Sequence, residues 1–97
     1  MAKSIMPFNR AGRCYLCGRI GSTEEHHIFE GSGRRKLSEQ YGLKCDLDHW
    51  CHNEPPDGVH FNKEKDLELK AIAQKVAMNY YGWTVDDFRR LFRKSYI

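Results

Sequence analysis

Two cysteines stand at a spacing that is typical of zinc ligands. Cys14 and Cys17 are separated by two residues and followed by Gly18, a pattern in which a turn directs both thiolates at one ion. In a reducing cytosol, the cysteines of a short chain are more often metal ligands or free thiols than disulfides. A thioredoxin-like redox pair requires a βαβ context with a helix after the pair, and here a glycine turn follows. We therefore expect this pair to bind zinc.

The other half of the zinc site is expected near Cys51. Asp48 and Cys51 stand three residues apart at the predicted start of a short helix, a separation that places both side chains on one face. Zinc accepts thiolate, imidazole or carboxylate ligands, so Cys45 and His49 compete with Asp48 for the fourth position. The favoured set of structural zinc ligands is Cys14, Cys17, Asp48 and Cys51.

Four of the five histidines form a second constellation. His26 and His27 are adjacent near the end of a predicted strand, so their side chains point to opposite faces. His52 on the predicted short helix and His60 after a turn at Gly58 could complete a metal site from the other side. Phosphodiester hydrolysis needs a base that activates water and a cation that stabilises the phosphorane and the leaving oxygen. These histidines could supply both functions.

The segments around these residues resemble a group of small phage and prophage HNH endonucleases, also called ββα-metal or His-Me finger nucleases. They are EEHHIF, the stretch GSGRRKLSEQYGL, the histidine of WCHN followed by EPPDGVHFN, and the ending FRRLFRKSYI, and the resemblance extends over nearly the whole chain from Cys14 onward. It implies a β-hairpin and a helix around a catalytic divalent ion, with a structural zinc nearby and DNA as substrate. By the same resemblance His27 is the general base, and the catalytic ion is bound by His26, His52 and His60.

The sequence departs from this family at three places. The middle Asn of the generic motif has no counterpart near residues 41–43, so the group that orients the base is not identified, and a backbone carbonyl is one candidate. Asp48 stands where relatives usually carry Cys, and Cys51 stands where some carry His. His60 follows His52 at a longer interval than the generic pattern has, with two prolines between them.

Three consecutive basic residues are the candidate DNA contacts. Arg34, Arg35 and Lys36 follow the Gly31-Ser32-Gly33 break, in a predicted loop where the DNA backbone would pass in an HNH fold. Such contacts bind phosphates without reading the base sequence. A solvated loop would explain the same charges equally well, so the loop's role stays open here.

The residues must be positioned by a small set of predicted elements. Alternation and turn signals predict strands over Glu24–Phe29 and Tyr41–Leu47, and Asp48 to His52 opens a short helix that ends before Pro55-Pro56. Apolar residues at helical spacing predict a helix over Lys63–Tyr81 that Gly82 stops. Thr84 is the expected N-cap of a second amphipathic helix, which carries Val85, Phe88, Leu91 and Phe92. The expected fold class is α+β, a small ββα-metal core with a zinc knuckle and two C-terminal helices.

Composition sets the remaining bounds. For this chain of 97 residues we expect a basic N-terminal arm over 1–13 and a single HNH nuclease domain over 14–97. Because a domain of this size has a small apolar core, a bound zinc ion would contribute to its stability. The net charge of +3 favours a polyanionic partner only weakly. No apolar run approaches the roughly 18 residues of a membrane span and the start lacks an apolar signal region, so we expect a cytoplasmic protein without membrane contact.

The expected function is that of an enzyme, a metal-dependent DNA endonuclease with a histidine base. Its expected cofactors are a divalent catalytic ion (Mg, Mn, Zn or Ni) and a structural zinc. DNA is the expected partner, with phage packaging or recombination proteins as further candidates, and the sequence carries no signal for the oligomeric state. Two alternatives stay open: a non-catalytic, zinc-stabilised DNA- or protein-binding module whose histidines only build the fold, and a packaging adaptor that has kept the nuclease fold.

Overall fold

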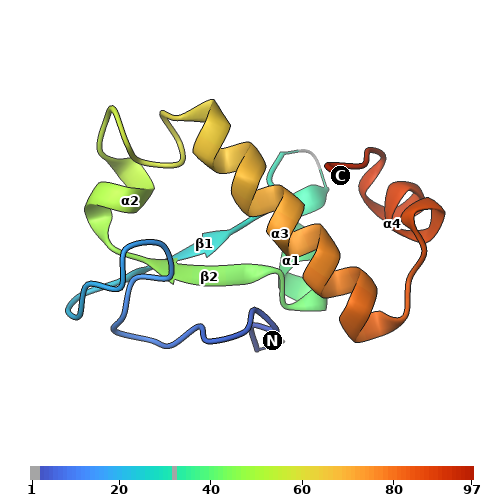
Figure 1. Ribbon diagram of the computed structural model, residues 1–97, viewed down its shortest axis with the longest axis horizontal. Helices are drawn as coiled ribbons and strands as arrows, with labels where there is room; N and C mark the ends of the chain where they lie inside the picture. The colour runs from blue at the N-terminus through green and yellow to red at the C-terminus, as the bar shows by residue number, and fades with distance from the viewer. Residues whose placement is uncertain (1–2, 32) are drawn as a thin grey trace.

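A two-stranded sheet and four helices make up the part of the chain that the structure, a computed structural model, describes, residues 3–31 and 33–97 (Figure 1). The elements are β1 (Glu24–His27), α1 (Arg34–Tyr41), β2 (Lys44–Leu47), α2 (His49–Asn53), α3 (Lys63–Tyr81) and α4 (Val85–Phe92). The expected α+β class is confirmed. The first two residues of the expected arm, and Ser32 of the expected glycine break, lie outside the described residues.

The two strands pair antiparallel and give the adjacent histidines different surroundings. His26 pairs with Cys45 and His27 pairs with Lys44. Because successive side chains of a strand point to opposite faces, His26 lies buried while His27 is half-buried on the other face. The first strand ends at His27 and not at Phe29 as expected, although Ile28 N still donates to the carbonyl oxygen of Leu43 at 3.0 Å.

A helix, α1, replaces the predicted loop that carries the three basic residues. Arg34, Arg35 and Lys36 form its first turn, so their expected placement in a loop was wrong. The expected second strand was also too long at its start, because Gly42 ends α1 in the left-handed conformation (φ 71) and β2 begins only at Lys44. Tertiary contacts stabilise this short helix: the Ser38 hydroxyl donates to the Phe29 carbonyl at 2.8 Å and accepts from the Phe29 amide at 3.0 Å.

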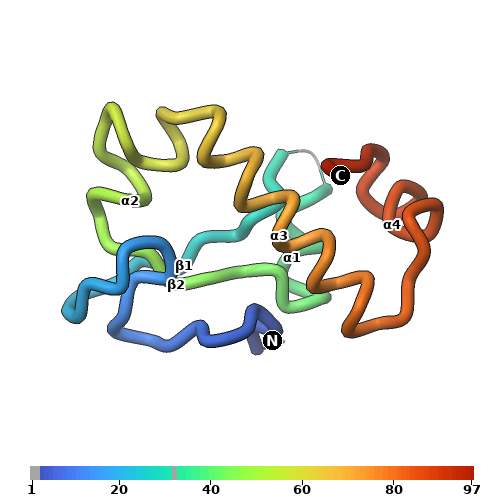
Figure 2. Tube along the Cα trace, in the orientation of Figure 1, coloured from blue at the N-terminus to red at the C-terminus, as the bar shows by residue number. Residues whose placement is uncertain are grey.

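The N-terminal segment runs along β2 before it enters the cysteine turn (Figure 2). Ile5 N donates to the Gly42 carbonyl at 2.9 Å, and the side-chain amide of Asn9 donates to Asp46 Oδ2 at 3.0 Å. Asp46 N in turn donates to Asn9 Oδ1 at 2.8 Å. Met6 is buried in the core. The described part of the expected arm is therefore packed against the sheet.

The two C-terminal helices, which the sequence predicted, pack their apolar side chains against the core residues of the hairpin. In Figure 1, α3 crosses in front of the sheet, with α2 towards one end of the molecule and α4 towards the other. α3 buries Leu69, Ala73 and Ala77, and α4 buries Phe88 and Phe92, in one cluster with the core residues of the hairpin. Asn62, Gly82 and Thr84 cap these helices. None of the helices in the described residues is both long and apolar enough to cross a bilayer.

Candidate metal centres

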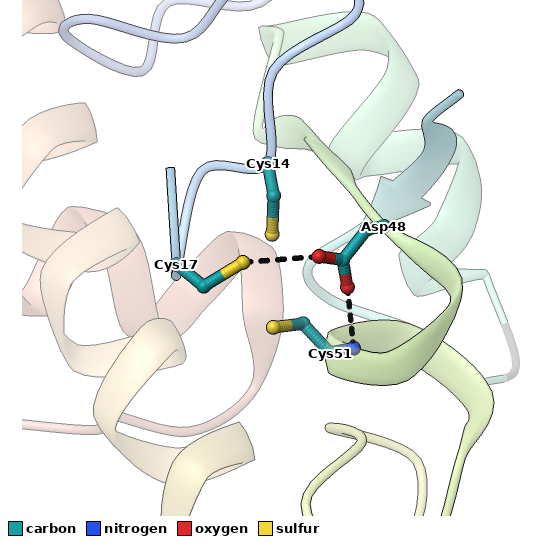
Figure 3. Close-up of side chains that lie close together, drawn as sticks. All are labelled: Cys14, Cys17, Asp48 and Cys51. Atoms are coloured by element: carbon teal, nitrogen blue, oxygen red, sulfur yellow. Dashed lines mark hydrogen bonds between the residues drawn. The ribbon is translucent and has the colours of Figure 1, made fainter. Parts of the chain in front are cut away.

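Three cysteines and one aspartate converge at the junction of the cysteine turn and α2. One potential ligand atom from each of Cys14, Cys17, Asp48 and Cys51 lies within 4.8 Å of the others. Figure 3 shows the three sulfur atoms directed toward one another and toward the Asp48 carboxylate. Thiolate and carboxylate ligands in a group of four suit tetrahedral zinc. The residues predicted for structural zinc are therefore brought together in an arrangement compatible with that ion.

Asp48 has two roles in this cluster. Its Oδ1 accepts a hydrogen bond from Cys51 N at 2.7 Å, which makes Asp48 the N-cap of α2. Its Oδ2 lies 3.0 Å from the sulfur of Cys17, on the side that faces the other thiols (Figure 3). One carboxylate oxygen thus fixes the helix start while the other is free to bind a metal ion. An aspartate at this position can meet both requirements with its two carboxylate oxygens.

Hydrogen bonds to its sulfur favour the thiolate form of Cys14. Burial opposes its ionisation, but backbone N–H groups of Asp48, Cys17 and Leu16 around the sulfur bring the pKa of Cys14 below its usual value. The Asp48 carboxylate next to Cys17 raises the pKa of that thiol. Burial raises the pKa of Cys51 well above its usual range. Binding of a divalent cation would favour ionisation of these thiols and offset the repulsion among the resulting thiolates and the carboxylate.

The two competitors for the fourth ligand position lie elsewhere. Cys45 is buried in the apolar core, and this burial raises its pKa to about 12. The imidazole of His49 is exposed, with Nε2 2.8 Å from Glu54 Oε1 and Nδ1 3.4 Å from Glu24 Oε2. Neither belongs to the cysteine cluster that the structure forms. Asp48 is therefore the residue that completes the set.

Three histidines form a second group about the open end of the hairpin. Ligand nitrogens of His26, His52 and His60 lie within 4.8 Å of one another, and the Nε2 atoms of His52 and His60 are 2.9 Å apart. The ring of His26 meets both of the others edge-on, with centroids 5.0 Å from His52 and 5.2 Å from His60. Imidazole groups in such a cluster suit Zn, Ni and related divalent ions.

His26 has no hydrogen-bond partner, although it is almost completely buried. Its residue exposure is 1%, and neither ring nitrogen has a partner within the described residues. Burial, followed by the nearby positive charge of His52 and His60 when protonated, lowers the pKa of His26 to about 3. Buried polar groups without partners are rare because their desolvation costs roughly 1–3 kcal/mol. A neutral imidazole that faces two others is therefore suited to binding a metal ion.

The turn between α2 and α3 brings His60 back to His52. Val59 N donates to the Cys51 carbonyl at 2.8 Å, and His60 N donates to the His52 carbonyl at 3.3 Å. Gly58 lies so close to the end of α2 that a Cβ atom there would be 2.8 Å from the backbone N and O of Glu54. The glycine is needed for this close approach. The long interval between His52 and His60 is thereby folded into one compact turn.

Glu24 orients His52, and the sequence reasoning did not identify it. Glu24 Oε1 lies 2.8 Å from His52 Nδ1, on the opposite side of the ring from the Nε2 atom that faces His60. The hydrogen bond to His52 lowers the pKa of Glu24, so the carboxylate is the acceptor and Nδ1 carries the proton. A carboxylate on the outer nitrogen of a metal-binding histidine fixes its tautomer and raises its basicity. The signal in the sequence was position: Glu24 is two residues before His26 and shares its strand face.

His27 belongs to a separate polar group on the other face of the strand. Its Nε2 lies 3.0 Å from Glu39 Oε1 of α1, and the second Glu39 oxygen accepts from the ammonium of Lys44 at 2.7 Å. Lys44 also lies 3.5 Å from Glu25. Burial would lower the pKa of Lys44, but its hydrogen bond to Glu39 and the charge of Glu25 raise it. The Lys44 ammonium thus supplies the positive charge between Glu25 and Glu39. This argues against a further metal site formed by these two carboxylates and His27.

One hollow connects the two histidine groups. It is lined by His27 from one face and by His52 and His60 from the other, together with Glu25, Glu30, Gly31 and Arg35. Lys36 lines an adjoining hollow that also reaches His27. Arg34 lies in the same helical turn as Arg35. The predicted base, two of the predicted ligands and one predicted phosphate contact are therefore neighbours.

Comparison with known proteins adds no further assignment. No family model, curated protein or solved structure matches the chain. Any functional assignment must therefore come from the residues themselves and their geometry.

Proposed function

We propose that the protein is a metal-dependent DNA endonuclease of the HNH type. In this proposal β1, β2 and α2 form the ββα-metal unit, with α1 as an insertion between the strands. The observation that carries it is the shared hollow, which is lined by His27, by two of the three clustered histidines and by Arg35. Phosphodiester hydrolysis requires a base, a cation and a phosphate contact within the length of one phosphodiester.

His26, His52 and His60 would hold the catalytic divalent ion. When bound, the ion supplies Lewis acidity that stabilises negative charge on the phosphate and the leaving oxygen. The three imidazoles fit such an ion because they are nitrogen donors in close proximity, because Glu24 orients His52, and because the ring nitrogens of His26 have no hydrogen-bond partner among the described residues. The four ligands of the cysteine cluster would hold zinc and stabilise the start of α2, which carries His52.

His27 would act as the general base, with Glu39 as its positioning residue. The hydrogen bond to Lys44, followed by that to His27, lowers the pKa of Glu39 to about 2, so this carboxylate is ionised and can only accept hydrogen bonds. His27 Nε2 must then carry the proton that it shares with Glu39. The other nitrogen, Nδ1, is left free to take a proton from water. Glu39 thereby fills the role for which the sequence offered no Asn.

The first turn of α1 would bind the DNA backbone. Arg34, Arg35 and Lys36 occupy the N-terminal turn, where acidic residues are absent. Positive side chains at this end add to the positive end of the helix dipole, which is unfavourable for the helix by itself. The same arrangement is favourable for a phosphate group. These contacts would position DNA without reading its sequence.

The non-catalytic alternative accounts less well for the histidines. A zinc-stabilised binding module needs the cysteine cluster but assigns His26 a purely structural role. A buried histidine that serves only the fold is expected to have a hydrogen-bond partner. His26 has none in the described part of the chain.

Incubation of the zinc-loaded protein with supercoiled plasmid tests this proposal. We expect nicked or linear DNA in the presence of at least one of Mg²⁺, Mn²⁺, Zn²⁺, Co²⁺ and Ni²⁺, and none after chelation of the added ion. Plasmid that stays supercoiled with every ion would overturn the nuclease assignment.

A further inference from the structure

Glu30 lies at the histidine cluster although it is not one of the three histidine ligands. It follows β1 and lines the shared hollow, and its side chain is 43% exposed. Its Oε1 atom is 3.5 Å from Nδ1 of His26 and 3.7 Å from Nε2 of His60. A single carboxylate oxygen therefore approaches two of the three imidazoles from the solvent side.

These separations are not those of hydrogen bonds. Among the described residues, Glu30 included, neither ring nitrogen of His26 has a hydrogen-bond partner. Nitrogen and oxygen ligands at about 2.0–2.2 Å from one tetrahedral ion stand roughly 3.3–3.6 Å apart. The distances from Glu30 to His26 and His60 are close to that spacing. Relative to His26 and His60 the oxygen is thus placed as a ligand would be, and a small movement of this exposed side chain would bring it to an ion that His52 also binds.

We propose that Glu30 is a fourth protein ligand of the ion bound by His26, His52 and His60. The inference rests on the metal centre of the proposed function and adds an anionic donor to its three neutral ones. The carboxylate lowers the net charge of the bound centre by one. A tetrahedral ion that expands to five-coordination would accept a phosphate oxygen as its fifth ligand.

The matched control is Glu25, a carboxylate in the same hollow. Glu25 Oε1 lies 4.0 Å from His27 Nε2 and Glu25 Oε2 lies 3.5 Å from Lys44 Nζ. Its side chain is 49% exposed, a fraction similar to that of Glu30. Glu25→Gln therefore removes the same charge from the same hollow without removing the proposed ligand.

Isothermal titration calorimetry with Ni²⁺ tests the inference on the full chain with zinc already bound at the cysteine cluster. Zinc content and circular dichroism are measured on each variant, so that folded protein is compared with folded protein. We expect the wild type to bind one further ion, Glu30→Gln to bind it roughly tenfold or more weakly, and Glu25→Gln to change the affinity by no more than about threefold.

Two other outcomes would overturn the inference, and they are distinguishable. If Glu30→Gln binds Ni²⁺ as the wild type does, or if both variants weaken binding equally, Glu30 is not a ligand and the histidine site of the proposed function stands. If the wild type binds no further ion, both the Glu30 inference and the proposed catalytic centre fail.

Discussion

The carboxylate of Glu24 lies 2.8 Å from Nδ1 of His52, on the opposite side of the ring from the nitrogen that faces His60. The same carboxylate group accepts from the side-chain amide of Asn53 at 3.1 Å. His52 is thereby held in one orientation and one tautomer. The hydrogen bond thus directs Nε2 of His52 towards His60, which is the orientation that metal binding by these two rings would need.

Glu24→Gln should weaken ion binding at the histidine cluster about 10- to 100-fold, because the amide cannot hold the Nδ1 proton as the carboxylate does. Calorimetric titration of the zinc-loaded variant with Ni²⁺ measures this change. Glu54→Gln is the control, since Glu54 contacts the exposed His49 and not His52. If the two variants bind Ni²⁺ with equal affinity, Glu24 does not contribute to the metal centre.

Asp48 variants separate helix capping from zinc binding. Asn is as good an N-cap as Asp but lacks the anionic oxygen, so Asp48→Asn should lose affinity for zinc while α2 still forms. Asp48→Ala should lose both and cost about 1 kcal/mol more in the free energy of unfolding. Zinc content and thermal melting measure the two effects, with Cys14→Ser as the variant that should release zinc outright. Full zinc retention in Asp48→Asn would exclude the carboxylate as a ligand.

The sequence predicted the elements whose stability is local. α3 was predicted because apolar residues recur at helical spacing from Leu69 to Tyr80 and because Gly82 stops the helix. Thr84 was predicted as a cap because its side chain can accept from the amide of Asp87, as it does at 3.1 Å. For the same reason the spacing paired Cys14 with Cys17 and Asp48 with Cys51, whereas only the fold brought the two pairs together and selected Asp48 over Cys45 and His49.

The sequence did not predict features that depend on distant contacts. α1 is eight residues long and presents only Leu37 and Tyr41 at helical spacing, so periodicity could not distinguish it from a charged loop. Its stability comes from Ser38 against Phe29 and from Gly42, which packs against the backbone of Lys3. Glu24 and Glu39, the carboxylates that contact His52 and His27, were missed for a similar reason. Glutamates are common on surfaces, and only their neighbours in the fold distinguish them.

Glu39→Gln should lower cleavage at saturating DNA by at least about tenfold, since His27 would lose the anionic partner that fixes its tautomer and supports its protonated form. The Michaelis constant and the Ni²⁺ affinity should stay close to those of the wild type, because the hydrogen bonds of Glu39 within the described residues are with His27 and Lys44. Steady-state kinetics on an oligonucleotide duplex measure both parameters. A rise in the Michaelis constant with an unchanged turnover number would instead assign Glu39 to substrate binding.

Replacement of Arg34, Arg35 and Lys36 by Ala should weaken binding to DNA of every sequence and flatten its dependence on salt, because fewer phosphate counterions are released. Fluorescence anisotropy at several salt concentrations gives the slope. The control replaces Arg89, Arg90 and Arg93, which removes three positive charges from residues that do not line the shared hollow. If both triple variants change the slope equally, net charge and not the first turn of α1 governs binding.

Plasmid cleavage by His27→Ala and His26→Ala across a range of metal concentrations tests the central claim most directly. His27 is assigned to proton transfer and His26 to binding of the catalytic ion. His27→Ala should therefore keep its zinc and its DNA affinity but cleave roughly a hundredfold or more slowly at every metal concentration. His26→Ala should recover part of its activity as the metal concentration rises. Cleavage by His27→Ala at the wild-type rate, or its restoration by added metal, would contradict the account.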